Sequence, residues 1–205
     1  MKRLQTLSAE ERESIRAAIA HAEGRTQARF VFSMVPVSDR YLVFPLLWGA
    51  LAAIAAAGLL AIFWPSLPLR YAFAAEAAIL VGLSLVLDWL PLRLLSVPAH
   101  VKRAHAHDFA HREFAARILA NPEHNGGIVL FISMGERYVR LLADRELHAK
   151  VGDAEWNRIV AELVVQIKRG KLSEGASGAI ASCAAILERH CPRRAPSVDH
   201  ASPSP

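Results

Sequence analysis

The chain has 205 residues, two cysteines and a formal net charge of +5 at pH 7. This charge is modest, and much of it lies in arginines beside apolar segments and in the pair Arg193 and Arg194, so it gives no reason to expect a nucleic-acid partner. Cys183 and Cys191 are not spaced as a CxxC pair and do not define a metal site alone, so we expect free thiols.

The N-terminal segment is predicted to contain a helix and a strand. Ser8 begins the sequence SAEE, which is typical of a capping box with Glu11, and the helix is expected to run to about Glu23, with Gly24 as its stop. Residues 29–35, RFVFSMV, are predicted to form a strand because they are β-branched and aromatic. Their incomplete alternation indicates burial on both faces.

Two long apolar runs follow. No charged residue occurs between Tyr41 and Leu69, and the run 41–64 is long enough to cross a hydrocarbon core of ~30 Å, which needs about 20 helical residues. A second run, 71–95, begins after a short break, so the pair predicts a membrane hairpin. The alternative is a buried hairpin in a soluble protein, but the first run is too long and too uniformly apolar for that.

The second run contains two acids, Glu76 and Asp88. An acid in the middle of a membrane helix costs about 2.5–3.5 kcal/mol. With a crossing centred within residues 78–95, Glu76 is expected at the outer interface and Asp88 deeper. Such acids can serve as proton or ion sites, but we favour a tolerated interfacial position for Asp88 because a basic flank follows it.

The basic residues predict the orientation of the hairpin. Only Arg70 lies in the connecting loop, whereas several basic residues flank the two runs. The positive-inside rule therefore places both termini in the cytoplasm. The flanking residues are Arg25, Arg29 and Arg40 before the first run, and Arg93, Lys102, Arg103 and Arg112 after the second.

The chain after the hairpin is predicted to alternate helices and strands. Residues 127–133, GIVLFIS, are the candidate for a central strand, and a tight turn at 134–136 leads into its hairpin partner. The other expected elements are a polar helix at 101–120, the partner strand at 137–144, a helix from about 153 to 169 and a last helix from Ser173, its expected cap, to Arg189.

The predicted organisation is one small α/β domain in two pieces. It comprises residues 1–40 and 96–192, separated by the hairpin at 41–95 and followed by a disordered, proline-rich tail at 193–205. The residues outside the hairpin suffice for one hydrophobic core.

The order of these elements resembles the TPM domain family. LSAEERESIRAAIAHAE before a strand, and NGGIVLFISMGERYVRLLADRELHAKVGDAEWNRIVAEL at 125–163, match the plan of that family. The resemblance covers about residues 7–36 and 100–190. It is closest to a bacterial branch in which a transmembrane hairpin is inserted after the first strand, which implies a multi-pass protein of the inner (plasma) membrane.

The resemblance implies two kinds of function. Some TPM proteins are described as acid phosphatases or as calcium-binding, and others as accessory or assembly factors of membrane complexes. Many members carry an aspartate-rich stretch before the first helix, but this chain has no acid before Glu10. The glycine common after the second hairpin strand is also replaced, in the neighbourhood of Asp144, Arg145 and Glu146. Both departures weaken an enzymatic assignment.

The candidate metal ligands are weak, and no catalytic residue or cofactor is predicted. His107 and His111 are spaced to share a helix face and to hold a transition metal, but we favour a juxtamembrane polar helix. Asp144, Glu146 and Asp153 have the chemistry to bind a divalent ion, but we favour Asp153 as a helix cap and the other two as solvated acids.

The leading hypothesis is a non-catalytic accessory, scaffold or assembly factor in the lipid bilayer, with a membrane-protein partner or a second copy of the chain. The small-residue run 52–58 offers a face for close helix packing. The first alternative is a membrane-bound, metal-dependent acid phosphatase, which rests on family analogy. The second is a proton or ion pathway through Glu76 and Asp88, which needs oligomerisation because two helices cannot enclose a pore.

Overall fold

The computed structural model describes residues 7–26, 28–120 and 126–190. These residues form two compact units, one from the segments up to Pro36 and from His107 onward, and one from Val37–Ala106. The chain enters the second unit after Pro36 and returns to the first unit after Ala106, within helix α5 (Ala99–Phe114). Asn125, Cys191 and the tail at 193–205 lie outside the described residues.

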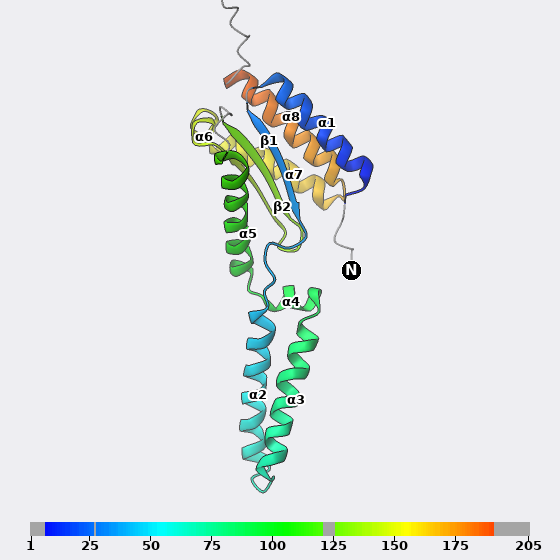
Figure 1. Cartoon of the computed structure of the whole chain (residues 1–205), viewed down its shortest axis with the longest axis vertical. Helices are drawn as coiled ribbons and strands as arrows, with labels where there is room; N and C mark the ends of the chain where they lie inside the picture. Colours follow the sequence, from blue (N-terminus) through cyan, green and yellow to red (C-terminus); the bar gives the residue numbers. More distant parts are fainter. Residues whose placement is uncertain (1–6, 27, 121–125, 191–205) are drawn as a thin grey trace, which may run out of the picture. The chain divides into compact units, whose positions relative to one another are not determined.

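A three-stranded sheet forms the centre of the first unit (Figure 1). Strand β1 (Arg29–Val35) pairs in parallel with β2 (Gly127–Ser133), and β2 pairs antiparallel with β3 (Tyr138–Ala143). All seven residues of β2 are buried, as its unbroken apolar sequence predicts for a central strand. The predicted strands and the hairpin turn are therefore confirmed. β1 and β3 are the edge strands, and the predicted burial of β1 on both faces is wrong, because only Phe30 and Ser33 of this strand are buried.

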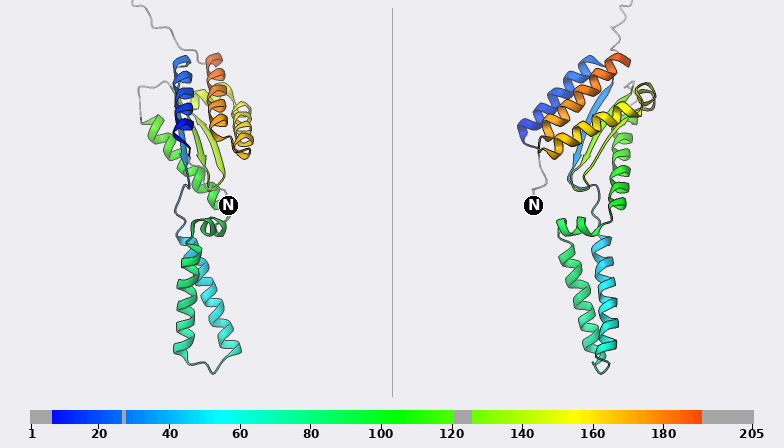
Figure 2. Two further views of the ribbon diagram at one scale, coloured as in Figure 1. Left: turned by 90° about the vertical axis from the view of Figure 1, so that its right-hand side faces the viewer. Right: turned by 180° about the vertical axis from the view of Figure 1, so that it is seen from behind.

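Helices cover both faces of the sheet (Figure 2). Helices α1 (Ala9–Arg25), α7 (Asp153–Lys168) and α8 (Leu172–His190) lie on one face, where Ile128, Leu130 and Ile132 of β2 enter the main core. The other face meets α5, because the ring of Phe131 lies 5.6 Å from that of Phe109. Alternate side chains of β2 therefore pack into apolar layers on opposite faces of the sheet.

The predicted capping box is confirmed. The side chain of Ser8 accepts a hydrogen bond from the backbone N–H of Glu11, and the Glu11 carboxylate accepts one from the N–H of Ser8. Gly24 was expected to end this helix, but it lies inside α1, and Thr26 is the C-cap. The buried hydroxyl of Thr26 donates to the carbonyl of Ala22, and this bond helps to satisfy the helix end without a glycine.

The C-terminal helices differ from the prediction in two places. A short helix α6 (Arg145–Val151), which the sequence reading missed, follows β3. Ser173 is not a helix cap but lies inside α8, where its hydroxyl donates to the carbonyl of Glu11 on α1. Helix α7 agrees with the prediction, because Trp156, Ile159 and Leu163 form its buried stripe.

The second unit contains two long apolar helices, α2 (Val43–Phe63) and α3 (Leu69–Leu87). Both are long and apolar enough to cross a membrane, and little of either is buried in the structure. The helices approach closely at Gly49, where an added Cβ would lie 2.5 Å from the hydroxyl of Ser84. Gly58, in the small-residue run, has no neighbour within 4 Å.

The end of the second apolar run corrects the sequence reading. It does not continue as one helix to Leu95, because α3 ends at Leu87, Asp88 is its C-cap and a separate short helix α4 (Leu90–Ser96) follows. Asp88 therefore lies at the helix end and not deep in the span, whereas Glu76 lies near the middle of α3. Asp88 accepts from the guanidinium of Arg93, which also donates to the carbonyl of Arg40.

The polar helix expected at 101–120 is divided. Helix α5 ends at Phe114, and a π-helical turn η1 (Ala115–Leu119) continues it. Ile118 of this turn contacts Gly127, where an added Cβ would lie 2.5 Å from its terminal methyl group. The close contact explains why a glycine begins β2.

Candidate functional site

A polar cluster joins the flank of α5 to β3. The Nδ1 atom of His107 lies 3.3 Å from the hydroxyl of Tyr138, and the imidazole rings of His107 and His111 are 4.3 Å apart. Arg140 is close enough to lower the pKa of the Tyr138 hydroxyl. We call these residues the α5–β3 cluster: His107, His111, Tyr138 and Arg140.

The repeat of an α-helix and the alternation of a β-strand bring the members of the cluster onto the same faces of α5 and β3. His107 and His111 are four residues apart on one helix, so they share a face. Tyr138 and Arg140 are two apart on one strand, so they project from the same face of the sheet, opposite Ser133 and Phe131 in the register. The sequence analysis named the two histidines but missed Tyr138 and Arg140, whose only local signal is their spacing in β3.

The surroundings of His111 disfavour its protonated form. Partial burial lowers the pKa of His111, His107 and Arg140 lower it further, and Asp108 opposes this effect. Burial raises the pKa of Tyr138, and Arg140 opposes that shift. Tyr138 is therefore a neutral phenol near pH 7, able both to donate and to accept a hydrogen bond.

The predicted acidic group has local partners. Asp144 is the N-cap of α6 and accepts from the N–H of Arg145, and Glu146 lies exposed in the first turn of the same helix. Asp153 begins α7, where Gly152 and not Asp153 is the N-cap. The carboxylate of Asp153 lies 2.8 Å from Nε2 of His148.

No group of three or more His, Cys, Asp or Glu side chains able to hold a metal ion occurs within the described ranges 7–26, 28–120 and 126–190. The two histidines on α5 and the three acids remain weak candidates for metal ligands, and a polar helix and solvated or capping acids remain the favoured interpretations. Arg140 beside the histidine pair acts against binding of a cation there.

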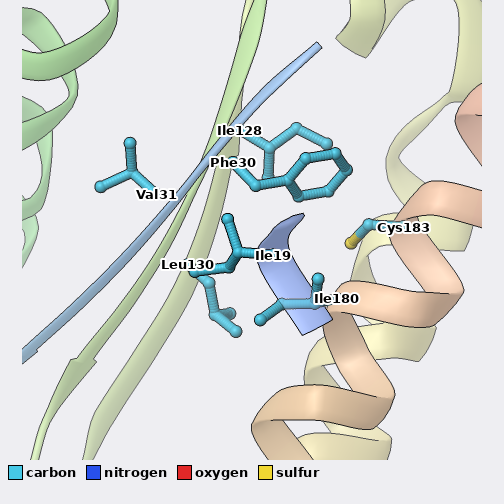
Figure 3. Close-up of a pocket in the computed structure, with 7 residues that line it drawn as sticks. All are labelled: Ile19, Phe30, Val31, Ile128, Leu130, Ile180 and Cys183. Carbon is cyan, nitrogen blue, oxygen red and sulfur yellow. The ribbon is translucent and has the colours of Figure 1, made fainter. Parts of the chain in front are cut away.

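A small apolar void lies between the sheet and the helices (Figure 3). It is lined by side chains of α1, β1, β2 and α8, and its volume is about 10 Å³. A void of this size with apolar walls stays dry and does not bind a ligand. Its lining residues are Ile19, Phe30, Val31, Ile128, Leu130, Ile180 and Cys183.

Cys183 predicts a pH dependence of stability. Burial raises the pKa of its thiol to about 12, whereas the unfolded thiol titrates near 9.0. Above that pH only the unfolded chain loses the proton, so the contribution of Cys183 to stability is full at lower pH and falls as the pH rises towards 12. Between about pH 8 and pH 10.5 the free energy of unfolding should fall by about 2 kcal/mol more in the wild type than in Cys183→Ala.

Chemical unfolding of the full chain in detergent measures this difference. All other titratable groups are the same in both proteins, so their contributions cancel in the comparison. Parallel pH profiles for the wild type and Cys183→Ala would contradict the prediction.

Comparison with known proteins gives a family and a fold. A family model described as the TPM domain matches residues 92–186. Among solved structures, the chain is similar to the NMR structure of the BA42 protein from the psychrophilic bacterium Bizionia argentinensis, with 14% sequence identity and a TM-score of 0.57 over 97% of this chain and 93% of that one. No curated protein matches the chain. The helices and the three-stranded sheet thus form an α/β fold of the TPM type, and residues 92–186 of the chain match the TPM domain.

Proposed function

We propose that the chain is a membrane-anchored TPM domain that acts as a non-catalytic accessory, scaffold or assembly factor of a membrane complex. The observation that carries the proposal is the apolar surface of α2 and α3. Most of their large apolar side chains are exposed, and only 11% of the most apolar stretch of α2, and none of that of α3, is buried. Burial of this surface in lipid or against another membrane protein removes it from water.

The sheet supports a hairpin with both ends on one side of the membrane. Strands β1 and β2 are direct neighbours in parallel register, from Arg29 against Gly127 to Val35 against Ser133. Helices α2 and α3 lie between them in the sequence. Because the two strands must meet in one compartment, the segment between them crosses the bilayer an even number of times, and a single crossing is incompatible with the fold.

One end of the hairpin carries polar and aromatic anchors. The indole N–H of Trp48 donates to the carbonyl of Ser96, and the ammonium of Lys102 donates to the carbonyl of Leu94. The guanidinium of Arg93 donates both to the carboxylate of Asp88 and to the carbonyl of Arg40, which precedes α2. Tryptophan and basic residues favour the membrane interface, and basic residues favour its cytoplasmic side. The proposal therefore includes an inner-membrane location with both termini in the cytoplasm.

The accessory role follows from the way the domain is attached. The chain passes twice between the domain and the hairpin, after Pro36 and before His107, so the domain is held at two points. Two attachments restrict its orientation more than a single flexible linker would, and this suits a scaffold. The acids that a metal-dependent phosphatase would use are a helix cap and a partner of His148, so the phosphatase remains the second prediction.

The test is recovery of a partner from native membranes. The full chain, tagged and solubilised in detergent, should co-purify with a specific membrane protein that mass spectrometry identifies. Ala55 and Gly58 are small, exposed and three residues apart on α2. Replacing both by leucine should abolish recovery of the partner, because bulky side chains prevent close helix packing.

The matched control is the double variant Ala74→Leu and Ala77→Leu on α3, where both alanines are exposed at the same spacing. It should recover the partner as the wild type does. Recovery of nothing beyond the protein itself would contradict the accessory role.

A further inference from the structure

A groove lies between α2 and α3 in the second unit. Its volume is about 500 Å³, within the range of ~300–1,000 Å³ that is typical of small-molecule sites. All of its lining residues except Ser96 are apolar, and Ala52 has the smallest side chain among them. The lining residues are Trp48, Leu51, Ala52, Leu83, Leu87 and Ser96.

The groove is polar at the end where α4 follows α3. Helix α4 lies across this end of the hairpin (Figure 1), and Ser96, its last residue, lines the groove. The indole N–H of Trp48 donates to the carbonyl of Ser96, 3.1 Å away. This bond satisfies the one polar group of the indole, so the rest of the ring forms an apolar wall. The groove therefore offers apolar walls along its length and polar groups at one end.

Lys102 brings a positive charge to the polar end. Its ammonium donates to the carbonyl of Leu94, 2.9 Å away. Leu94 and Ser96 are two residues apart on α4, which is about 3 Å along a helix axis. An ammonium group has three donors, so the bond to Leu94 leaves two for another acceptor. Lys102 is thus placed to bind an anionic group at the end of the groove.

The flanks of the hairpin, residues 37–42 and 88–106, carry more basic than acidic residues. Asp39 and Asp88 are the acids, and Asp88 is paired with Arg93. Within the part of the chain that the structure describes, Lys102 has no ion pair with an acid. A negative charge bound at Lys102 would balance this excess. The basic residues of the flanks are Arg40, Arg93, Lys102 and Arg103.

We propose that the groove and Lys102 form a binding site for one anionic phospholipid. The upper part of an acyl chain lies between α2 and α3, and the headgroup phosphate accepts a hydrogen bond from the ammonium of Lys102. The inference rests on the proposed membrane anchoring of these helices. Charge complementarity favours a lipid over an apolar helix of a partner protein, because such a helix would leave the charge of Lys102 unbalanced.

Native mass spectrometry of the full chain in detergent counts the lipids bound to each molecule. One phosphatidylglycerol should bind, about fivefold or more tightly than phosphatidylcholine, which has no net charge. Lys102→Gln should weaken binding of phosphatidylglycerol about tenfold, because it removes a charged hydrogen-bond donor, and Lys102→Arg should preserve binding. Arg103→Gln removes the same charge from the next, exposed position and should have a smaller effect.

A variant that fills the groove without a change of charge separates a site from general attraction to the basic flanks. Ala52→Leu should weaken binding of phosphatidylglycerol about tenfold, because the leucine displaces about two methylene groups of the acyl chain. Ala61→Leu, at an exposed position of α2 outside the groove, should leave binding unchanged. Equal losses in Lys102→Gln and Arg103→Gln, with no loss in Ala52→Leu, would overturn the site.

Quenching of Trp48 in lipid vesicles locates the acyl chain. Phosphatidylglycerol with bromine on its upper acyl chain should quench this tryptophan more strongly than brominated phosphatidylcholine at the same mole fraction. Trp64→Phe and Trp89→Phe remove the other exposed tryptophans, and Trp156 is buried in the core of the first unit.

The same experiment distinguishes the lipid site from the membrane anchoring on which it rests. Equal quenching by the two brominated lipids, with the chain still sedimenting with the vesicles, would overturn the lipid site alone. A chain that does not sediment with the vesicles would overturn the anchoring as well.

Discussion

Replacing Phe131 by alanine is expected to lower the free energy of unfolding of the domain by about 3–5 kcal/mol. Phe131 is fully buried in the central strand and contacts the rings of Phe109 on α5 and Tyr138 on β3. The substitution removes these contacts and leaves a cavity between the sheet and α5. A domain of this size is stable by only about 5–15 kcal/mol, so the loss is a large part of the total.

Hydrogen exchange of the β2 amides in the full chain measures the effect. A loss of this size makes global opening roughly 10²- to 10³-fold more frequent, or more. Phe73→Ala is the matched control, because it deletes the same side chain from α3, where Phe73 is 70% exposed. It should leave exchange of β2 unchanged. Unchanged exchange in Phe131→Ala would mean that α5 does not complete the domain core.

The elements that the sequence predicts well are those with a local physical cause. β2 is recognisable because a short, uninterrupted apolar run between glycine and a turn suits a strand buried on both faces. The start of α1 is recognisable because Ser8 and Glu11 satisfy each other's backbone donors at a fixed spacing. Apolar length alone predicts α2 and α3, since each has enough residues to cross a bilayer.

The features that the sequence did not predict depend on partners distant in the chain. Arg93 donates both to Asp88 at the end of α3 and to the carbonyl of Arg40, 53 residues away, and no local pattern indicates this second bond. Likewise, the α5–β3 cluster exists because Tyr138 meets His107, 31 residues away. The stop at Gly24 failed for a local reason, because Thr26 completes the helix end with its own hydroxyl, which donates to the carbonyl of Ala22.

A pair of arginines in the middle of α2 is expected to release the chain from membranes. Leu51 and Ile54 are three residues apart, 49% and 65% exposed, and close to the centre of the helix. Each arginine costs about 2.5–3.5 kcal/mol at the centre of a membrane helix, whereas each leucine or isoleucine contributes only about 0.3–0.6 kcal/mol. The double variant Leu51→Arg and Ile54→Arg therefore offsets the contribution of roughly ten apolar residues.

Helix α3 should not rescue the anchoring. It is the less apolar helix, it contains Glu76 near its middle, and a crossing by α3 alone would separate β1 from β2. Extraction of membranes with alkaline carbonate should leave the wild type in the pellet and move the double variant to the supernatant. Ala17→Arg with Ala20→Arg on α1 adds the same charge at exposed positions with the same spacing, and it should stay in the pellet. If the α2 variant also stays in the pellet, α2 does not cross the bilayer, and its exposed apolar surface is covered by protein instead.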